Sequence, residues 1–382
     1  MLIKALAEFI LQPVVWLTII AVIISYFKRI KIERKQFRIA INNDFYEGRH
    51  LIKNGILFAL IGSLIMISIG IMLPSAWIVV YQILIIVELL CFGLLTIDSI
   101  WFYFLSILLF ALNSLGIIKP LQGGLLTSTW DNFLKSGVAL MVLGAILSGF
   151  KLLMLWRFDP TMLLPIIKAG KRGRRLVNYS WRELTLIPLV CLIPGSQIQT
   201  LVPGWPYLTL AGHSFAIFIL PAVISSGISF SRQAAGETLK FKKHQLQLLM
   251  IVFLLAAISC YLWIKLVPIA WLVLLGVTLT VAGVRYRFMR QQSNWYFETH
   301  DGIRIVAVKP KTPAAKMNLQ PGDVILTCNG LKVQNERELY HALQQEPTYC
   351  RLKVRSYAGK LKLTQGAIFA GAPHEIGMII FH

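Results

Sequence analysis

Charged residues are scarce in this sequence, and acidic ones are the scarcest. Only 14 % of the 382 residues are charged, whereas soluble domains average about 25 %. Just 17 Asp and Glu stand against 38 Lys and Arg, which gives a formal net charge of +21. Because 56 % of the residues are hydrophobic, the chain has too little charge to cover a surface in water. We therefore expect much of that surface to face lipid.

Patterns of disulfide, metal or catalytic chemistry are also missing. The five cysteines show no Cys-x-x-Cys spacing, which argues against a disulfide framework and against a zinc site. The only His-Glu pair, His374-Glu375, lacks the second histidine that a membrane zinc protease needs one helical turn later. No segment is left to hold a serine-protease domain with its nucleophile, base and orienting carboxylate. The sequence therefore predicts a protein that is not an enzyme and that binds no metal and no cofactor.

Long apolar runs, by contrast, fill the first three quarters of the chain. A membrane-spanning helix needs about 20 mostly apolar residues. The second half of this region contains Pro194-Gly195 and Pro203-Gly204, so the two runs that flank them could be broken or re-entrant. We predict a polytopic α-helical membrane bundle of about eight or nine spans over residues 1–290. The nine candidate spans are Phe9–Phe27, Leu51–Leu73, Trp77–Thr96, Ile100–Ile118, Phe133–Trp156, Leu184–Val202, Tyr207–Phe230, Leu246–Ile264 and Val267–Val284.

The basic residues predict how these spans are oriented. They gather after the first, fifth, seventh and last candidate spans, and an excess of Lys and Arg is typical of cytoplasmic loops. With nine spans, every basic loop and the carboxyl-terminal tail fall on the cytoplasmic side, and the amino terminus lies outside if the first span crosses. The first span has no cleavage site for a signal peptidase, so we expect it to be retained. This orientation signal explains the net charge without a nucleic-acid partner.

One basic cluster is compact enough to bind anionic lipid at the membrane surface. It could equally serve only as an orientation signal. Its residues are Lys171, Arg172, Arg174 and Arg175.

Polar residues at membrane depth are candidates for function. Glu88 lies midway along the third candidate span, and the sequence shows no matching basic residue in a neighbouring span. Asn113, Lys151 and His213 are further candidates. A transporter or channel would use Glu88 for ions or protons, whereas in a scaffold it would make a hydrogen bond between helices. No inverted repeat of the kind that many transporters show is evident.

The tail over residues 291–382 has no apolar run long enough to span a membrane and carries the signals of a small α+β domain. Thr312-Pro313 favours the start of a short helix, and Asn329-Gly330 is a strong hairpin signal. Asn335 and Glu338 have the spacing of a capping box, which predicts a helix that follows. The expected strands cover residues 302–308, 324–328, 331–333, 350–355, 360–364 and 376–381.

This order of elements resembles a PDZ domain of the bacterial type. In such domains a partner peptide adds a strand to a sheet edge beside a helix. The resemblance implies that the loop before Ile303 holds a peptide carboxylate, and Arg304 stands where the family often has glycine, so an internal peptide segment could bind instead. The residues that carry the resemblance are Gly302-Ile303-Arg304-Ile305, Pro310 to Ala315, Leu319 to Leu326, Asn329-Gly330 and Glu338-Leu339.

The same resemblance implies which side chains line the peptide pocket. Ile303 and Ile305 would form its floor, and Leu339 with Ala342 or Leu343 would form its helical wall. The alternative is that these apolar residues belong to the core of the domain.

The whole architecture, a polytopic bundle with basic loops and a cytoplasmic PDZ tail, resembles the MinJ family of membrane adaptors for division-site selection in Gram-positive rods. The resemblance implies a scaffold at septum and poles that bridges a DivIVA-type coiled-coil protein and a MinD-type ATPase, with other division proteins as contacts. Two other functions stay open: a transporter or channel with a regulatory PDZ domain, and an accessory partner of a membrane protease.

Overall fold

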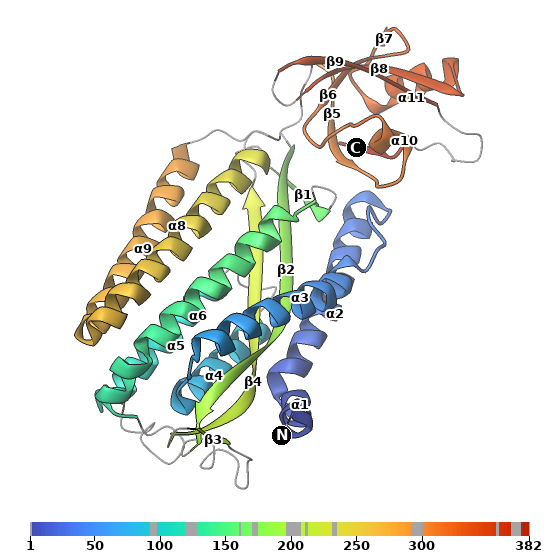
Figure 1. Ribbon diagram of the computed structural model, residues 1–382. Coiled ribbons are helices and arrows are strands. Elements are labelled where there is room, and N and C mark those ends of the chain that lie inside the picture. The colour runs from blue at the N-terminus through green and yellow to red at the C-terminus, as the bar shows by residue number, and fades with distance from the viewer. Residues whose placement is uncertain are drawn as a thin grey trace.

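The computed structural model describes residues 2–91, 98–118, 128–159, 162–169, 175–195, 208–210, 213–230, 235–291, 296, 299, 301–356, 359–367 and 376–381. It consists of a helical bundle that encloses a long β-hairpin and of a small domain at one end of the bundle (Figure 1).

The hairpin is the longest continuous feature of the molecule. Strand β2 (Arg175–Pro194) pairs antiparallel with β4 (His213–Phe230), and the register holds from Tyr179 opposite Phe230 to Pro194 opposite Phe215. Twenty residues of strand extend roughly 65 Å at the usual rise, so the hairpin runs the length of the helices (Figure 1). Two short strands, β1 (Leu164–Ala169) and β3 (Leu208–Leu210), complete a sheet of order β1-β2-β4-β3.

Two of the predicted spans, 184–202 and 207–230, are therefore wrong as helices, because nearly all of their described residues form β2, β3 and β4. Hydropathy does not distinguish a strand from a helix here, since a buried strand and a buried helix are equally apolar. Proline explains the outcome: Pro188 and Pro221 would each break a helix, and in the hairpin they lie directly opposite each other. Val190, two residues further along β2, points its N–H away from β4, to Ser63. In an antiparallel pair, every second residue of a strand directs its N–H to the same edge. The nitrogen of Pro188 therefore also points away from β4, so its missing N–H removes no hydrogen bond between β2 and β4.

Helices surround this hairpin. Among the described residues, five are long and apolar enough to cross a membrane, which confirms an apolar helical bundle but not eight or nine spans. Two more, α4 (Ser75–Cys91) and α5 (Ser99–Ser114), have only 17 and 16 residues. The other helices are α1 (Leu2–Leu11), α2 (Pro13–Phe37), α3 (Tyr46–Ile69), α6 (Trp130–Trp156), α8 (Ala235–Leu262) and α9 (Val267–Gln291), with a 3-10 turn, η5 (Ile264–Leu266), before α9.

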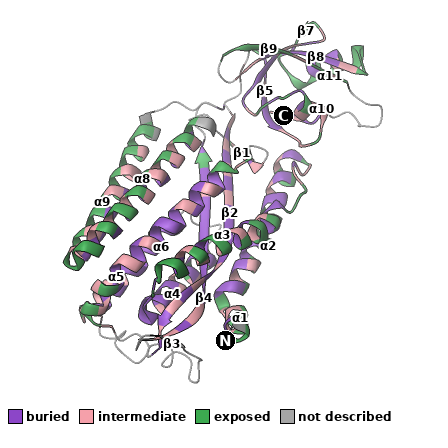
Figure 2. Cartoon of the chain, in the orientation of Figure 1, coloured by how far each residue is buried: buried purple, intermediate pink, exposed green. Residues whose placement is uncertain are grey.

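Burial divides the bundle into an inner and an outer layer (Figure 2). In α6 the most apolar window is 67 % buried, whereas the corresponding windows of α8 and α9 are 28 % and 22 % buried. Large apolar side chains such as Leu255, Ile258 and Leu272 on α8 and α9 are exposed, as expected of surfaces that face lipid. The basic ends of α2, α8 and α9 all lie at the end of the bundle where the small domain sits (Figure 1).

The small domain has the elements that the sequence predicts. Its sheet has the order β10-β5-β6-β8-β9, with β7 paired to β6. Asn329 and Gly330 have φ angles of 48° and 85°, as a type I′ hairpin turn requires, and Asn335 caps the second helix. The elements are β5 (Ile303–Val308), α10 (Pro313–Lys316), β6 (Val324–Cys328), β7 (Leu331–Lys332), α11 (Glu336–Gln345), β8 (Tyr349–Arg355), β9 (Leu361–Ala367) and β10 (Met378–Ile380).

An apolar cluster joins the small domain to the end of the hairpin. Val306, Ala307 and Ile379 of the small domain pack with Tyr179 and Phe230 of the hairpin. The hydroxyl of Tyr179 donates to the carbonyl oxygen of Val306 at 2.6 Å. The sheet of the small domain thus has one face in its own core and the other against the membrane domain.

A substitution of Gly55 tests how closely α3 packs against β2 of the hairpin. A Cβ added there would lie 2.5 Å from the carbonyl oxygen of Leu186, so Gly55→Ala must push α3 away from β2. We expect a loss of about 1–3 kcal/mol, as for other overpacked cores, visible as a lower midpoint of thermal unfolding in detergent. Gly276→Ala in α9 is the control, because nothing lies within 4 Å of its added Cβ. Equal midpoints for the two variants would contradict the packing of α3 on β2.

Candidate functional site

The predicted peptide-pocket residues lie together in the small domain. Ile303, Ile305, Leu339 and Ala342 belong to one buried cluster, and Leu343 packs at its margin. Ile305 and Ala342 are completely buried, so in the described structure these side chains serve as core. A peptide-binding role for them stays a prediction.

Strand β5 is paired along both of its edges. Ile303 and Arg304 pair with β6, and Ile305, Ala307 and Val308 pair with β10. The outermost strands of the sheet are β10 and β9. A peptide that adds a strand beside Ile305 would therefore have to lie next to β10 or take its place. The sequence suggested only a last strand near residue 378, and its pairing partner could not be read from the local pattern.

A cavity of about 430 Å³ opens beside Gly302, Ile303 and Arg304. The first turn of α11 forms its other wall with Asn335, Glu336 and Arg337 as lining residues. Arginine predominates among the charged residues of its lining, which also includes Arg175 from the start of β2. The loop at Gly302, which was predicted to hold a peptide carboxylate, and the start of the predicted helix at Asn335 thus line the same, mostly basic cavity.

Arg175 is the one described member of the predicted lipid-binding cluster. Its guanidinium lies 5.7 Å from the centre of the Phe381 ring, within the range of a cation–π contact. Lys171, Arg172 and Arg174 lie outside the described residues.

Glu88 has partners that the sequence did not reveal. Its Oε1 accepts a hydrogen bond of 2.5 Å from Ser225 Oγ on β4, and the ammonium group of Lys151 on α6 is close enough to act on its charge. The expectation that Glu88 has no basic residue nearby is therefore wrong. Residues more than 60 positions apart meet here because α4 and α6 both pack near the hairpin.

Glu88 is one end of a buried polar network (Glu88, Asp98, Ser99, Lys151, Ser225 and Lys242). Lys151 forms an ion pair with Asp98 and donates to Ser99 Oγ at 3.3 Å. Lys242 Nζ lies 3.0 Å from the other oxygen of Asp98. Buried charges are tolerated only when they are paired and hydrogen-bonded. Asp98, Lys151 and Lys242 meet this condition, whereas Glu88 accepts from Ser225 through Oε1 and its Oε2 has no hydrogen-bond partner among the described residues. The network connects α4, α5, α6 and α8 to β4.

A second group of buried charges ties α2 to α3. Arg29 Nε donates to Glu47 Oε1 at 2.7 Å, and Arg29 Nη1 donates to Glu33 at 3.3 Å. The i, i+4 spacing of Arg29 and Glu33 was the one sequence signal for this group. No cluster of three or more His, Cys, Asp or Glu that could hold a metal occurs in the part of the chain that the structure describes.

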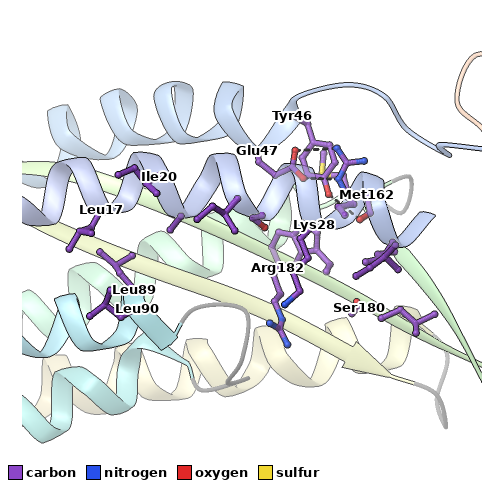
Figure 3. Close-up of a pocket in the computed structure, with 18 residues that line it drawn as sticks. Leu17, Ile20, Lys28, Tyr46, Glu47, Leu89, Leu90, Met162, Ser180 and Arg182 are labelled. Atoms are coloured by element: carbon purple, nitrogen blue, oxygen red, sulfur yellow. Dashed lines mark hydrogen bonds and ion pairs between the residues drawn. The ribbon is translucent and has the colours of Figure 1, made fainter. Parts of the chain in front are cut away.

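A cavity of about 490 Å³ lies between α2, α4 and β2 (Figure 3). Leu17, Ile20 and Leu89 line its apolar part, and Lys28 and Arg182 line its basic part. Figure 3 shows these two parts at different positions along α2. The lining of this cavity is therefore amphipathic.

The polar network predicts a strong effect of removing Lys151. Lys151→Met leaves Asp98 with one ammonium partner instead of two, and breaking a buried ion pair costs about 3–5 kcal/mol. Lys135→Met on the same helix is the matched control, because the Lys135–Asp131 pair is 2.6 Å long but about two-thirds exposed, with side chains 68 % and 67 % accessible. Thermal unfolding in detergent should show a large loss for Lys151→Met and little change for Lys135→Met. A loss of the same size in both would mean that the network contributes no special stability.

Comparisons with known proteins agree with this architecture. The PDZ domain family matches residues 274–355, from within α9 to the end of β8. The probable cell division topological determinants MinJ of Lacticaseibacillus paracasei and Lacticaseibacillus casei (strain BD-II) are each 33 % identical over 222 residues, 57 % of this chain and 58 % of theirs. The match thus spans less than two thirds of those two relatives.

A third relative is matched over almost its whole length. The cell division topological determinant MinJ of Bacillus subtilis (strain 168) is 24 % identical over 391 aligned positions, which cover 99 % of this chain and 94 % of that protein. Taken with the apolar helices and the PDZ sheet, these matches make the chain a MinJ-like protein with a PDZ domain.

Proposed function

We propose that this protein is a non-enzymatic membrane adaptor in the selection of the division site. It recruits cytoplasmic partners through the PDZ domain and bridges a DivIVA-type protein and a MinD-type ATPase at septum and poles. The likeness to MinJ proteins supports the process. The observation that carries the adaptor role is the firm seating of a PDZ domain on a membrane-embedded hairpin.

A fixed seat suits an adaptor because it sets the orientation of the bound partner relative to the membrane. Domains joined by small polar interfaces move freely. Here the contact is apolar, and Val177 N donates to the carbonyl oxygen of Tyr296 at 2.9 Å just before the domain begins. Partners bound to the PDZ domain would thus be held at a constant height above the lipid.

The basic helix ends favour a cytoplasmic position of the PDZ domain. They lie at the same end of the bundle as this domain (Figure 1), and clusters of Lys and Arg are retained on the cytoplasmic side. A multi-pass protein with this orientation would display the PDZ domain to cytoplasmic division proteins.

The basic cavity beside Gly302 is the place where we expect partners to bind. Arg304, Arg337 and Arg175 line it together with Glu336. Surplus positive charge favours an acidic segment or a peptide carboxylate. The outermost strand β10 offers a sheet edge near this cavity for strand addition.

Localisation in a rod-shaped Gram-positive host that lacks its own MinJ-type protein tests the proposal. We expect the fluorescently tagged full chain to be enriched at septum and poles. Arg337→Glu, which reverses a charge in the cavity lining, should reduce this enrichment several-fold, and truncation after Arg290 should abolish it. Lys360→Glu is the control, because Lys360 is exposed in the turn between β8 and β9, away from the cavity.

The point variants are needed because truncation also uncovers Tyr179 and Phe230, whose exposure could disturb the membrane domain by itself. An even membrane distribution of the full chain would contradict the division-site role. Enrichment that survives both Arg337→Glu and truncation would contradict recruitment through the PDZ domain.

A further inference from the structure

Another cavity of about 480 Å³ lies between β4, α8 and α9 and borders the polar network at Asp98, Ser225 and Lys242. It shares Trp181 and Arg182 with the cavity between α2, α4 and β2. Three basic side chains line it, namely Arg182 from β2, Lys242 from α8 and Arg285 from α9. The only acidic residue among its described lining is Asp98. The proposed adaptor function makes no use of this cavity.

The charges around the cavity are not balanced. Lys242 is satisfied by Asp98 and by the carbonyl oxygen of Gly227, at 3.0 and 2.9 Å. Arg182 and Arg285 have neither a hydrogen bond nor an ion pair with any described residue, although both are partly buried. Arg285 is also close enough to Lys242 to repel it. Such a surplus of positive charge in a low-dielectric place favours an anion.

Two buried donors point to the same conclusion. Trp181 Nε1 and Ser226 Oγ both have no hydrogen-bond partner among the described residues. Each residue is only 2 % exposed, and each lines the cavity. An unpartnered buried donor costs free energy, and a ligand that brings several acceptor oxygens would satisfy both. A phosphate group has such oxygens, and its negative charge would neutralise the charges of Arg182 and Arg285.

The position of the cavity indicates where this phosphate comes from. Arg285 and Tyr286 lie near the end of α9, and Thr278, at the deeper end of the lining, is about 10 Å lower along the helix. Tyr286 is 58 % exposed and Val284 62 % exposed on the outer face, where aromatic and apolar side chains meet the membrane interface. Leu249 and Ala282 add apolar lining next to the charged part.

We propose that this cavity binds the phosphate headgroup of an anionic phospholipid. Arg182 and Arg285 neutralise the phosphate, and Trp181 and Ser226 donate hydrogen bonds to its oxygens. The acyl chains leave along the lipid-facing side of α9. Bound lipid would fill the gap between the hairpin and α8–α9, so it would hold the outer helices on the structure that carries the PDZ domain.

Native mass spectrometry of the full chain, purified in detergent and titrated with phosphatidylglycerol, tests this proposal. We expect wild-type protein to bind phosphatidylglycerol in preference to phosphatidylcholine. Arg285→Gln should weaken phosphatidylglycerol binding about fivefold, the effect of one charge near a membrane surface. Arg287→Gln is the matched control, because Arg287 is an exposed arginine of the same helix end that does not line the cavity, and it should leave the affinity unchanged.

Ser226→Ala gives a second, nearly isosteric test that leaves all charges in place. It should weaken binding several-fold without changing the elution profile in size exclusion. Equal affinities for wild type, Arg285→Gln and Ser226→Ala would overturn the proposal. Displacement of phosphatidylglycerol by inorganic phosphate or glycerol 3-phosphate at comparable concentrations would also overturn it, because the cavity would then be a site for a soluble phosphate.

Discussion

A two-stranded ribbon leaves half of its backbone N–H and C=O groups pointing outward, and inside lipid each unpaired group costs several kcal/mol. The outward-pointing groups of the β2–β4 hairpin make hydrogen bonds to residues of the surrounding helices and of the segments that join them. Val190 N donates to Ser63 Oγ on α3, Val223 N to the Tyr81 hydroxyl on α4, and Ser225 N to Ser99 Oγ on α5. The carbonyl oxygens of Leu192 and Ile219 accept from Leu73 N and Gln12 Nε2.

This requirement explains features that look unrelated in the sequence. The pair α4–α5 is short because Ser99 at the start of α5 has to reach Ser225, which lies opposite Leu184 halfway along the hairpin. Asp98, which caps α5, is brought to the same depth and so draws Lys151 and Lys242 into the buried network. At the end near the PDZ domain, Tyr179 and Phe230 of the hairpin pack with Val306, Ala307 and Ile379 of that domain. One element thus connects the interior of the helical bundle to the PDZ domain.

Short sequence motifs correctly predicted the features that depend on neighbouring residues, namely a helix cap, a hairpin turn and the order of the elements in the PDZ domain. Asn335 caps α11 as predicted, with Glu338 N donating to Asn335 Oδ1 at 2.9 Å. The reciprocal bond to the Glu338 carboxylate comes from Gln334 N at 2.7 Å, one residue before the cap. The Asn329-Gly330 turn and the order of the PDZ elements were also predicted correctly. The hairpin was missed because hydropathy does not distinguish strands from helices, although Pro188 and Pro221 were a usable signal against helix. The partners of Glu88 and the pairing of β10 with β5 depend on contacts between residues far apart in the sequence. A short stretch of sequence therefore does not predict them.

Disulfide cross-linking in membrane vesicles tests the hairpin most directly. In a variant without the five natural cysteines, cysteine pairs would be placed at Ser180 with Ser229, Leu186 with Val223, and Leu192 with Ile217, which are opposite one another in the register. Steps of six residues keep one face of a strand, whereas in a helix they turn by about 240°. We predict that all three pairs cross-link and that the shifted pair Ser180 with Ile228 does not. Cross-linking of only one of the three pairs would mean that these segments are helices, and the hairpin could not then organise the molecule.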